Sequence, residues 1–367
     1  MTEQSYKISE DVWKSLAEFR APNPLGFGLV PAPVMFSATF ENGRWSEGKL
    51  LPYGPIEMSP GARALHFAEQ VFEGMKAYRV GRPTANLFRP RDNYLRFRRS
   101  AERISMTPVP EALFYQGIHG VVGACTPIVP DQTGQSLYVR PFLFGTEPGY
   151  AIRASASARF MVIASPADPY SAGAMKVLIE REQVRAAAGG LGTAKTGANY
   201  AASLQSSARA LARDYTVALW LDPSTRQNIE ELSGMNLFAV IGDELHTPAL
   251  NDSILQGVTR DSLIVLAREL GWRVVERIVP VAELLSRLSS GECSEVFACG
   301  TAAIVCPISV IGDADGSQYR PAAVDDRARV LRERLLSIQE RRSADPYGWI
   351  VEVSPLTRSP VIRAVNG

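Results

Sequence analysis

Residues 192–200 read GTAKTGANY, so Lys195 is the one charged side chain in a run of small and polar residues. A lysine amine forms a Schiff base with an aldehyde once it has lost its proton, and partial burial away from carboxylates favours that loss. Residues 229–236 read IEELSGMN, and Glu231 or Glu230 can place a carboxylate beside a ring nitrogen. A pyridoxal ring withdraws electrons only while that nitrogen stays protonated. The pairing predicts a pyridoxal-phosphate site with Lys195 as the Schiff-base lysine; a solvated loop lysine is the plainer interpretation.

Two segments offer donors for the phosphate of such a cofactor. Residues 87–96 read LFRPRDNYLR, and Arg96 shares a predicted helix with Arg98 and Arg99. An arginine fork suits a phosphate better than a lysine does, although a solvated helix face explains the same cluster. Residues 256–262 read QGVTRDS, a glycine turn that opens a helix. The free amides and the positive dipole end at such a helix start favour an anion.

Two further segments suit a substrate that carries a carboxylate. Residues 299–303 read CGTAA at the end of an apolar run. A turn of such small residues either brings its amides close to a carboxylate or simply packs tightly. Tyr138 and Arg140 share one face of a predicted strand, because side chains alternate along it. An inward arginine requires an anion or a carboxylate partner, and a substrate role is favoured over a structural ion pair.

The composition indicates two domains that act on small molecules or associate with a second copy. The chain has 367 residues, of which 46% are hydrophobic and 21% are charged. A chain of this length is too long for one ordinary hydrophobic core. A net charge of +1 with interspersed signs gives no basic stripe for nucleic acid and no polybasic membrane segment. Residues 1–7 (MTEQSYK) lack the apolar core of a signal peptide, which predicts a cytoplasmic location. No metal site is expected, and Cys125, Cys293, Cys299 and Cys306 are predicted to be reduced core thiols.

The predicted fold class is α+β or mixed α/β, without the regular alternation of a Rossmann sheet. We expect a small N-terminal α+β domain over residues 1–165, an interdomain loop over 166–174 and a large domain over 175–367. The predicted helices cover 92–104, 198–213, 259–270 and 281–288; the strands cover 136–144, 159–164, 215–221 and 273–279; and a hairpin over 237–248 turns at Gly242 and Asp243. Beyond Gly312 we expect surface loop and a late helix.

Six motifs, taken in order, resemble those of the branched-chain amino acid aminotransferases, a group within the fold-type IV pyridoxal-phosphate enzymes. They are FEGMKA, LFRP, LYVRP, KTGANY, MNLF and GTA, and the resemblance extends from about Phe27 to Val310. It implies a two-domain fold-type IV architecture like that of the D-amino acid aminotransferases, and a homodimer. It also implies a ping-pong exchange of the amino group between L-branched-chain or related apolar amino acids and a 2-oxo acid such as 2-oxoglutarate, in branched-chain amino acid biosynthesis.

The resemblance also implies roles for individual residues. Lys195 is then the Schiff-base lysine and the acid-base group that moves the α-proton, while Tyr200 bonds the ring oxygen of the cofactor and Glu231 its ring nitrogen. The implied phosphate ligands are Arg96, the backbone of Val258 and Thr259, and Thr301. The implied substrate contacts are the Thr301–Ala302 turn for the α-carboxylate, Phe27, Phe67, Tyr138 and Arg140 for the side-chain pocket, and Tyr150 and Ile152 on a loop that reaches the neighbouring subunit's site.

The chain departs from the family pattern close to the substrate. Phe67 stands where the family commonly has a tyrosine that helps to hold the glutamate carboxylate, and Gly234 replaces a threonine. These departures leave open a specialised biosynthetic aminotransferase for a bulkier or non-protein amino acid. Three further hypotheses are an aminodeoxychorismate-type lyase, a D-amino acid transaminase and a catalytically silent binding protein. The motifs around Arg140 and Thr301 argue against the lyase, and the intact set around Lys195 argues against a silent protein.

Overall fold

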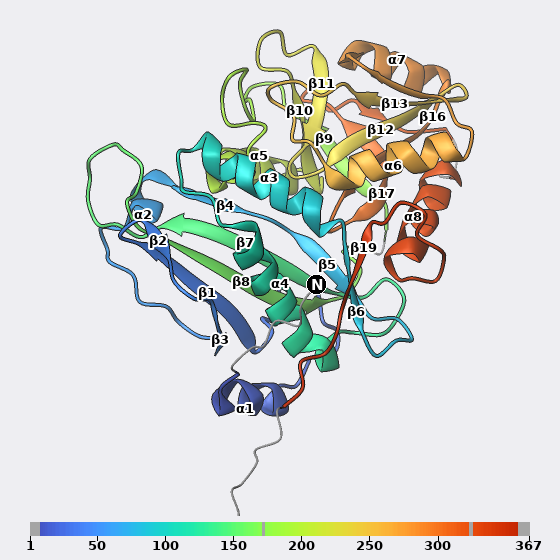
Figure 1. Cartoon of the computed structure of the whole chain (residues 1–367). Coiled ribbons are helices and arrows are strands. Elements are labelled where there is room, and N and C mark those ends of the chain that lie inside the picture. Colours follow the sequence, from blue (N-terminus) through green and yellow to red (C-terminus); the bar gives the residue numbers. More distant parts are fainter. Residues whose placement is uncertain (1–7, 171–172, 323–325, 359–367) are drawn as a thin grey trace, which may run out of the picture.

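The computed structural model describes residues 8–170, 173–322 and 326–358. Figure 1 shows two halves side by side, each built on one sheet with helices packed against it. Within the described residues, one sheet contains nine strands and the other ten. The predicted mixture of helices and strands is therefore confirmed. The N-terminal segment 1–7, and residues 171–172 of the predicted interdomain loop, lie outside the described residues.

The first sheet is antiparallel in each of its described pairings, in the order β19-β6-β5-β7-β8-β1-β2. Strand β3 pairs with β1, and β4 pairs with β7. The bounds are β1 Val34–Glu41, β2 Arg44–Trp45, β3 Lys49–Pro52, β4 Gln70–Phe72, β5 Met75–Tyr78, β6 Ala85–Phe88, β7 Ser136–Gly145, β8 Ala158–Ala167 and β19 Ile350–Val353.

The second sheet is mixed, in the order β14-β13-β12-β16-β17-β9-β10-β11-β15, with β18 paired to β17. Strand β9 runs parallel to both β10 and β17, and β13 runs parallel to β14. The bounds are β9 Met175–Ile179, β10 Val217–Leu221, β11 Asn228–Leu232, β12 Asn236–Ile241, β13 Glu244–Pro248, β14 Val274–Arg277, β15 Val279–Pro280, β16 Cys293–Gly300, β17 Ile304–Gly312 and β18 Gln318–Tyr319.

The helices cover the sheets and bury their apolar faces. In Figure 1, α3 and α4 lie over the first sheet, while α6, α7 and α8 lie around the second. The core of the first half joins Phe114 of α4 to Phe160 of β8, with ring centroids 5.9 Å apart. The bounds are α1 Glu10–Glu18, α2 Arg63–Phe67, α3 Pro90–Arg103, α4 Glu111–Cys125, the 3₁₀ turn η1 Thr126–Ile128, α5 Gly197–Ala212, α6 Val258–Glu269, α7 Val281–Ser290 and α8 Asp326–Gln339.

Helix ends and turns follow local chemistry that is readable in the sequence. Pro90 occupies the first turn of α3, where its missing N–H costs no hydrogen bond. Gly291 ends α7 in the left-handed conformation at φ 79°. Gly242 has φ 58° in the turn between β12 and β13, as the hairpin prediction requires. The predicted helices and strands around these signals are confirmed within a few residues at each end.

Two predictions about the organisation need correction. Strand β8 continues to Ala167, so the first residues of the predicted interdomain loop belong to the first sheet. The C-terminal region contains more than surface loop and a helix, because β19 pairs with β6 in the register Ile350↔Phe88. The chain thus returns to the first sheet after completing the second, as the red strand in Figure 1 shows. The domain boundaries as such stay a prediction.

The four cysteines have the buried environments that the sequence predicts. Burial raises the pKa of the thiols of Cys125, Cys293 and Cys299 to about 12. Among the described residues, no group of three or more His, Cys, Asp or Glu side chains is arranged to hold a metal ion. In the same part of the chain, no helix combines the length and the apolar character needed to cross a membrane.

Candidate active site

Lys195 lies where the two halves meet, in the loop that leads into α5. Its backbone N–H donates to the hydroxyl of Ser100 on α3 at 2.9 Å, and its carbonyl accepts from the N–H of Phe72 at 3.0 Å. The next residue, Thr196, donates its hydroxyl to the carbonyl of Gln70 at 2.7 Å. Elements of the first half therefore hold the lysine loop of the second half at both edges.

The lysine amine contacts Tyr200, to which the family resemblance assigns the ring oxygen of the cofactor. Lys195 Nζ lies 2.8 Å from the hydroxyl of Tyr200, which stands in the first turn of α5. The Phe72 ring completes the group: its centroid lies 5.0 Å from Lys195 Nζ and 4.9 Å from the Tyr200 ring. An aromatic wall on the amine limits its contact with water. No role for Phe72 is apparent in the sequence, because its partners lie far away along the chain.

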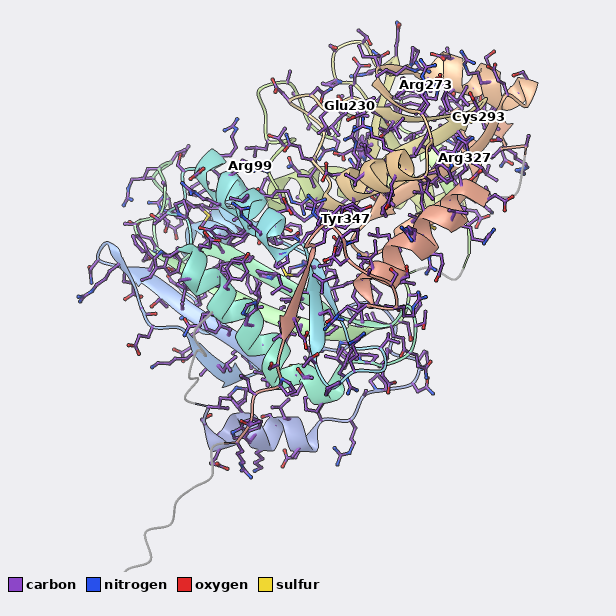
Figure 2. All side chains as sticks on the ribbon, turned by 45° about the vertical axis from the view of Figure 1, so that its right-hand side comes forward. Arg99, Glu230, Arg273, Cys293, Arg327 and Tyr347 are labelled. Atoms are coloured by element: carbon purple, nitrogen blue, oxygen red, sulfur yellow. The ribbon has the colours of Figure 1, made fainter. Side chains whose placement is uncertain are left out.

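Of the two neighbouring glutamates on β11, Glu231 lies on the face toward Tyr200 and Ala194, and Glu230 does not. Its two carboxylate oxygens accept from Arg185 at 2.7 Å and from Asn236 Nδ2 at 3.2 Å. Glu230 points the other way, as alternation along a strand requires, and accepts from Ser253 and from Asn251. Figure 2 labels Glu230 within the half built on the second sheet. Of the two glutamates, Glu231 is thus the one that lines the pocket with Tyr200, and its role beside a ring nitrogen stays a prediction.

The Glu231 carboxyl is almost fully buried, at 3% exposure. Burial raises the pKa of Glu231 to about 7, although the Arg185 charge acts in the opposite direction. Arg185 also donates to the carbonyls of Gly192, at 3.3 Å, and of Ser253. It therefore ties the carboxylate to the loop that carries Lys195. Sequence reasoning missed Arg185, and only its position ten residues before the lysine connects the two along the chain.

Arg96 lies beside the start of α6, but it is also committed to an internal ion pair. Its Nε and Nη2 donate to the two oxygens of Glu73 at 2.7 and 2.8 Å, and its Nη1 donates to the carbonyl of Gln256 at 2.9 Å. Gln256 directly precedes Gly257, the N-cap of α6. One hydrogen of Nη1 remains after these bonds within the described residues, which leaves a donor for an anion at the helix start. The glutamate partner was not predicted.

At the start of α6 the backbone of Gly257 lies very close to the side chain of Asn236. A Cβ on Gly257 would lie 2.0 Å from Asn236 Oδ1, so a side chain at this position would have to displace Asn236. Asn236 also donates to the carbonyl of Leu255 at 3.1 Å, and thereby joins Glu231 to the turn before α6. The amides of Val258 and Thr259 belong to the first turn of the helix, where backbone donors have no partner inside the helix.

Only one arginine of the cluster on α3 turns inward. Arg96 is buried at 5% exposure, whereas Arg98 and Arg99 are exposed. Arg98 pairs with Glu102 one turn later at 2.8 Å, and Figure 2 labels Arg99 on the outer side of the helix. The solvated-face interpretation therefore describes these two, and the phosphate interpretation concerns Arg96 alone.

Three of the residues predicted to line the side-chain pocket, Phe27, Tyr138 and Arg140, form a connected aromatic and cationic group. Arg140 Nη2 donates to the hydroxyl of Tyr138 at 2.9 Å, which confirms that both share one face of β7. The Arg140 guanidinium lies 4.6 Å from the centre of the Phe72 ring, and the Phe27 and Tyr138 rings are 5.0 Å apart. Phe72 thus joins this group to Lys195.

The predicted carboxylate turn, Thr301–Ala302, connects β16 to β17. The Ala302 carbonyl accepts a hydrogen bond of 2.8 Å from Lys76 Nζ on β5 of the first sheet. The turn is therefore anchored to the opposite half of the molecule, close to the strand that carries Tyr138.

Three predicted substrate residues lie on the surface of this chain. Phe67 ends α2 with 41% of its surface exposed, and Tyr150 and Ile152 are 73% and 93% exposed on the loop between β7 and β8. The His66 and Tyr150 rings are 5.3 Å apart, so α2 and this loop touch each other. Among the described residues, neither Tyr150 nor Ile152 forms a hydrogen bond or a ring contact with Lys195.

The combined geometry fits a pyridoxal-phosphate cofactor. It offers an amine beside a phenol hydroxyl, a buried carboxylate for a ring nitrogen, and a helix start with an arginine for a phosphate. Tyr200 and Glu231, the residues expected to bond the cofactor ring, line one pocket. Its lining comprises Arg185, Ala194, Asn199, Tyr200, Ser203, Glu231, Ser233, Gly234 and Leu255.

Comparisons with known proteins agree with this chemistry. Residues 70–311 match the family model described as Amino-transferase class IV. A probable branched-chain-amino-acid aminotransferase of Streptomyces coelicolor is 41% identical over 335 residues, which is 89% of this chain and 92% of that protein. The branched-chain-amino-acid aminotransferase of Mycobacterium tuberculosis is 40% identical over 339 residues, with the same coverage of 89% and 92%. A crystal structure of a branched-chain amino acid aminotransferase from T.th. with pyridoxamine 5'-phosphate has a TM-score of 0.71 and 28% identity, covering 86% of this chain and 98% of that one.

Proposed function

This chain belongs to the class IV aminotransferases, and from that premise we propose that it moves the amino group of L-branched-chain or related apolar amino acids to a 2-oxo acid such as 2-oxoglutarate. The fold is that of the fold-type IV enzymes, and the cofactor is pyridoxal 5'-phosphate. The observation that carries the proposal is the 2.8 Å contact between Lys195 Nζ and the hydroxyl of Tyr200, a residue that also lines a pocket together with the buried Glu231.

When bound, the cofactor supplies an aldehyde for amines and an electron-withdrawing ring. Lys195 is the residue that bonds to it and that afterwards carries the α-proton as a free amine. Tyr200 orients the ring through its oxygen, and Glu231 holds the proton on the ring nitrogen. Arg96, the backbone amides of Val258 and Thr259, and Thr301 bind the phosphate. These assignments rest on the geometry described above together with the family pattern.

The substrate is oriented by groups from both halves. The Thr301–Ala302 turn receives the α-carboxylate, and Phe27, Phe67 and Tyr138 surround an apolar side chain. Arg140, with the Tyr138 hydroxyl at 2.9 Å, provides donors for the second carboxylate of glutamate. Because Phe67 lacks a hydroxyl, this acceptor is held by one donor fewer than the family pattern supplies.

The working unit in this proposal is a homodimer. Tyr150 and Ile152 are largely exposed in their own chain, which leaves them available to complete the pocket of a second copy. A role in branched-chain amino acid biosynthesis belongs to the same proposal. The cytoplasmic location stays a prediction from the sequence.

The test is a half-reaction without an acceptor. The purified protein, loaded with pyridoxal phosphate, is mixed with L-leucine, L-isoleucine, L-valine and a panel of larger amino acids, and its visible spectrum is recorded. We expect L-leucine to convert the spectrum to that of pyridoxamine phosphate with release of the 2-oxo acid, and Lys195→Ala to show no such conversion. Conversion only by other amino acids would replace the proposed substrate class, and turnover by Lys195→Ala would refute the assignment of the lysine.

A further inference from the structure

Glu69 is a buried carboxylate for which the proposed function has no role. It stands between α2 and β4, and only 8% of its surface is exposed. A carboxylate is rarely buried to this extent unless it accepts hydrogen bonds or faces a positive charge. The contacts of this side chain therefore indicate what it does.

Glu69 binds both ends of the loop between β7 and β8, residues 146–157. Its Oε1 accepts from the N–H of Ser155 at 2.8 Å, close to the end of the loop. Its backbone carbonyl accepts from the N–H of Gly145, the last residue of β7, at 3.0 Å. The glycine leaves space for the carboxylate, because a Cβ on Gly145 would lie 2.5 Å from Oε2 of Glu69. One residue thus closes the loop at its base.

The hydrogen bond from Ser155 is the main compensation for the burial of the carboxylate. Burial raises the pKa of Glu69, and the Ser155 N–H opposes this more strongly than the charges of Arg63 and Arg153 do. Within the described part of the chain, Oε2 has no hydrogen-bond partner, so Oε1 is the atom through which the side chain holds the loop. Release of the loop would leave the carboxylate buried without this bond, and the two therefore stabilise each other.

A second anchor holds the middle of the same loop. Arg63 of α2 donates to the carbonyl of Ala151 and, at 3.2 Å, to that of Arg153. These two carbonyls flank Ile152, and Tyr150 precedes them. The backbone of the loop is thus fixed on both sides of the two exposed side chains that the proposed dimer needs, and the segment that contains Arg63 and Glu69 does the fixing.

We propose that Glu69 is a positioning residue that acts on the active site of the second copy, because its carboxylate closes the loop that completes that site in the proposed dimer. This inference rests on the proposed function, and in particular on the homodimer. It predicts that the carboxylate of one copy serves the Schiff-base lysine of the other copy rather than its own.

The experiment separates action within one chain from action between chains by means of mixed dimers. Glu69→Ala removes the loop contact, and Lys195→Ala has an intact loop but no Schiff-base lysine. In a dimer of these two variants, the intact loop of the Lys195→Ala copy completes the site of the Glu69→Ala copy, which has an intact lysine. One working site therefore returns. Co-expression of the two variants with different affinity tags, followed by purification on both tags, isolates this mixed dimer.

Two further variants provide the controls. Glu231→Gln combined with Lys195→Ala is the matched mixed dimer, because Glu231 lines a pocket with Tyr200, which contacts Lys195 in the same chain. Two defects in the same site of each chain cannot complement each other. Glu69→Gln is the conservative variant, since its amide oxygen still accepts the N–H of Ser155.

For the Glu69→Ala dimer we expect the KM for L-leucine to rise about tenfold or more, while the affinity for pyridoxal phosphate, measured by its absorbance, stays unchanged. Glu69→Gln should remain close to wild type. The mixed dimer of Glu69→Ala and Lys195→Ala should return to the wild-type KM with about half of the wild-type kcat, because one of its two symmetry-related sites is complete. The mixed dimer that contains Glu231→Gln should show no such recovery.

A mixed dimer that keeps the raised KM, or a Glu69→Ala dimer with the wild-type KM, would overturn the proposal. If thermal unfolding shows that Glu69→Ala does not fold, Ser155→Pro takes its place in the same mixed dimer, since it removes the N–H from the loop side of the contact. Failure of the proposed function is a separate result, because it appears in the wild-type protein as inactivity with every amino acid or as full activity of a monomer.

Discussion

At the scale of single residues, substitution of Glu231 tests the proposed partner of the ring nitrogen. Glu231→Gln keeps the shape of the carboxylate but leaves Arg185 without its counter-charge and the ring nitrogen without an acid partner. We expect the rate of the L-leucine half-reaction to fall about a hundredfold or more, as for other removed electrostatic contacts. Stopped-flow spectra measure this. Glu230→Gln is the neighbouring control, since Glu230 bonds Asn251 and Ser253 instead, and an equal loss in both variants would contradict the assignment.

The same residue predicts a pH dependence of cofactor binding. The pKa of Glu231 is raised to about 7, so the carboxyl is largely protonated below that pH and ionised above it. Only the ionised form can hold a protonated ring nitrogen. The affinity of the cofactor-free protein for pyridoxal phosphate should therefore increase as the pH rises through about 7, and this increase should be much smaller in Glu231→Gln. Titrations across that range by cofactor absorbance measure it; identical pH profiles in both proteins would refute the prediction.

Phe67 tests how the second substrate is recognised. Phe67→Tyr adds a hydroxyl at the end of α2, where 41% of the residue is exposed and space is available. We expect the KM for 2-oxoglutarate to decrease about three- to tenfold, the effect of one added hydrogen bond of ordinary strength at a partly exposed position. The KM for L-leucine should change little. Steady-state kinetics with each acceptor measure both values, and an unchanged acceptor profile would show that the missing hydroxyl does not limit recognition.

The residues that the sequence did not reveal share one property. Lys195, Glu231 and Arg96 stand in short segments whose composition indicates their chemistry, whereas the role of Tyr200 came from the family resemblance. The structure places Tyr200 and Glu231 in the lining of one pocket and Lys195 Nζ 2.8 Å from the Tyr200 hydroxyl. Phe72, Lys76 and Arg185 act through partners that are distant along the chain, such as the Ala302 carbonyl for Lys76. A single sequence contains no signal for such a contact, because the contact exists only after both sheets have formed.

At the scale of elements, Asp222 stabilises the turn between β10 and β11. Burial acts to raise the pKa of its carboxyl, but hydrogen bonds from the N–H groups of Thr225 and Asn228 and from nearby hydroxyls outweigh burial and hold the pKa below its usual value. Asp222→Asn replaces an ionised acceptor with an amide. We expect a loss of about 1–3 kcal/mol in the free energy of unfolding near neutral pH.

The pH dependence of that loss gives the check. The folded pKa of Asp222 is lower than the unfolded value of 3.8, so its contribution is present above that pH and disappears as the pH falls through the folded pKa. Urea denaturation at neutral and at acidic pH should show the wild-type advantage shrinking on acidification. A constant difference between the two proteins would mean that the carboxylate charge is not responsible.

Elements with strong local signals were predicted, and those with weak ones were not. Helix α6 follows a glycine turn and has a clear apolar pattern. Helix α4 contains Gly117, Gly120 and Gly123, which weaken helix propensity, yet Gly117 is needed because a Cβ there would lie 2.9 Å from Val162 on β8. Strand β19 has only four residues, too few to show alternation, and its pairing with β6 joins segments more than 250 residues apart.

At the scale of the whole molecule, the chemistry depends on how two sheets are held against each other. Lys195 is fixed by β4 and α3 of the first half, and the carboxylate turn is fixed by β5. The return of the chain through β19 adds a further connection between the halves. A site assembled in this way is sensitive to relative movement of the halves.

In the proposed dimer, the loop between β7 and β8 contacts a second copy of the chain. Arg63 of α2 is almost fully buried and donates to the loop carbonyls of Ala151 and Arg153. These hydrogen bonds hold the loop segment that carries Tyr150 and Ile152. In Figure 1 this loop and α2 lie at one end of the first sheet. Ile152 is 93% exposed here, beside Tyr150 at 73%, and in the proposed dimer both side chains would be covered by the second copy.

Ile152→Glu should therefore weaken the dimer, because a charge would replace an apolar side chain in the contact. We expect the dimer dissociation constant to rise about tenfold or more, with activity per chain that falls on dilution and recovers at high protein concentration. Analytical ultracentrifugation combined with assays over a dilution series measures both. Ile278→Glu is the matched control, since Ile278 is 68% exposed on the other half. A wild-type protein that is active as a monomer, or a variant whose activity is independent of concentration, would show that the loop completes no neighbouring site.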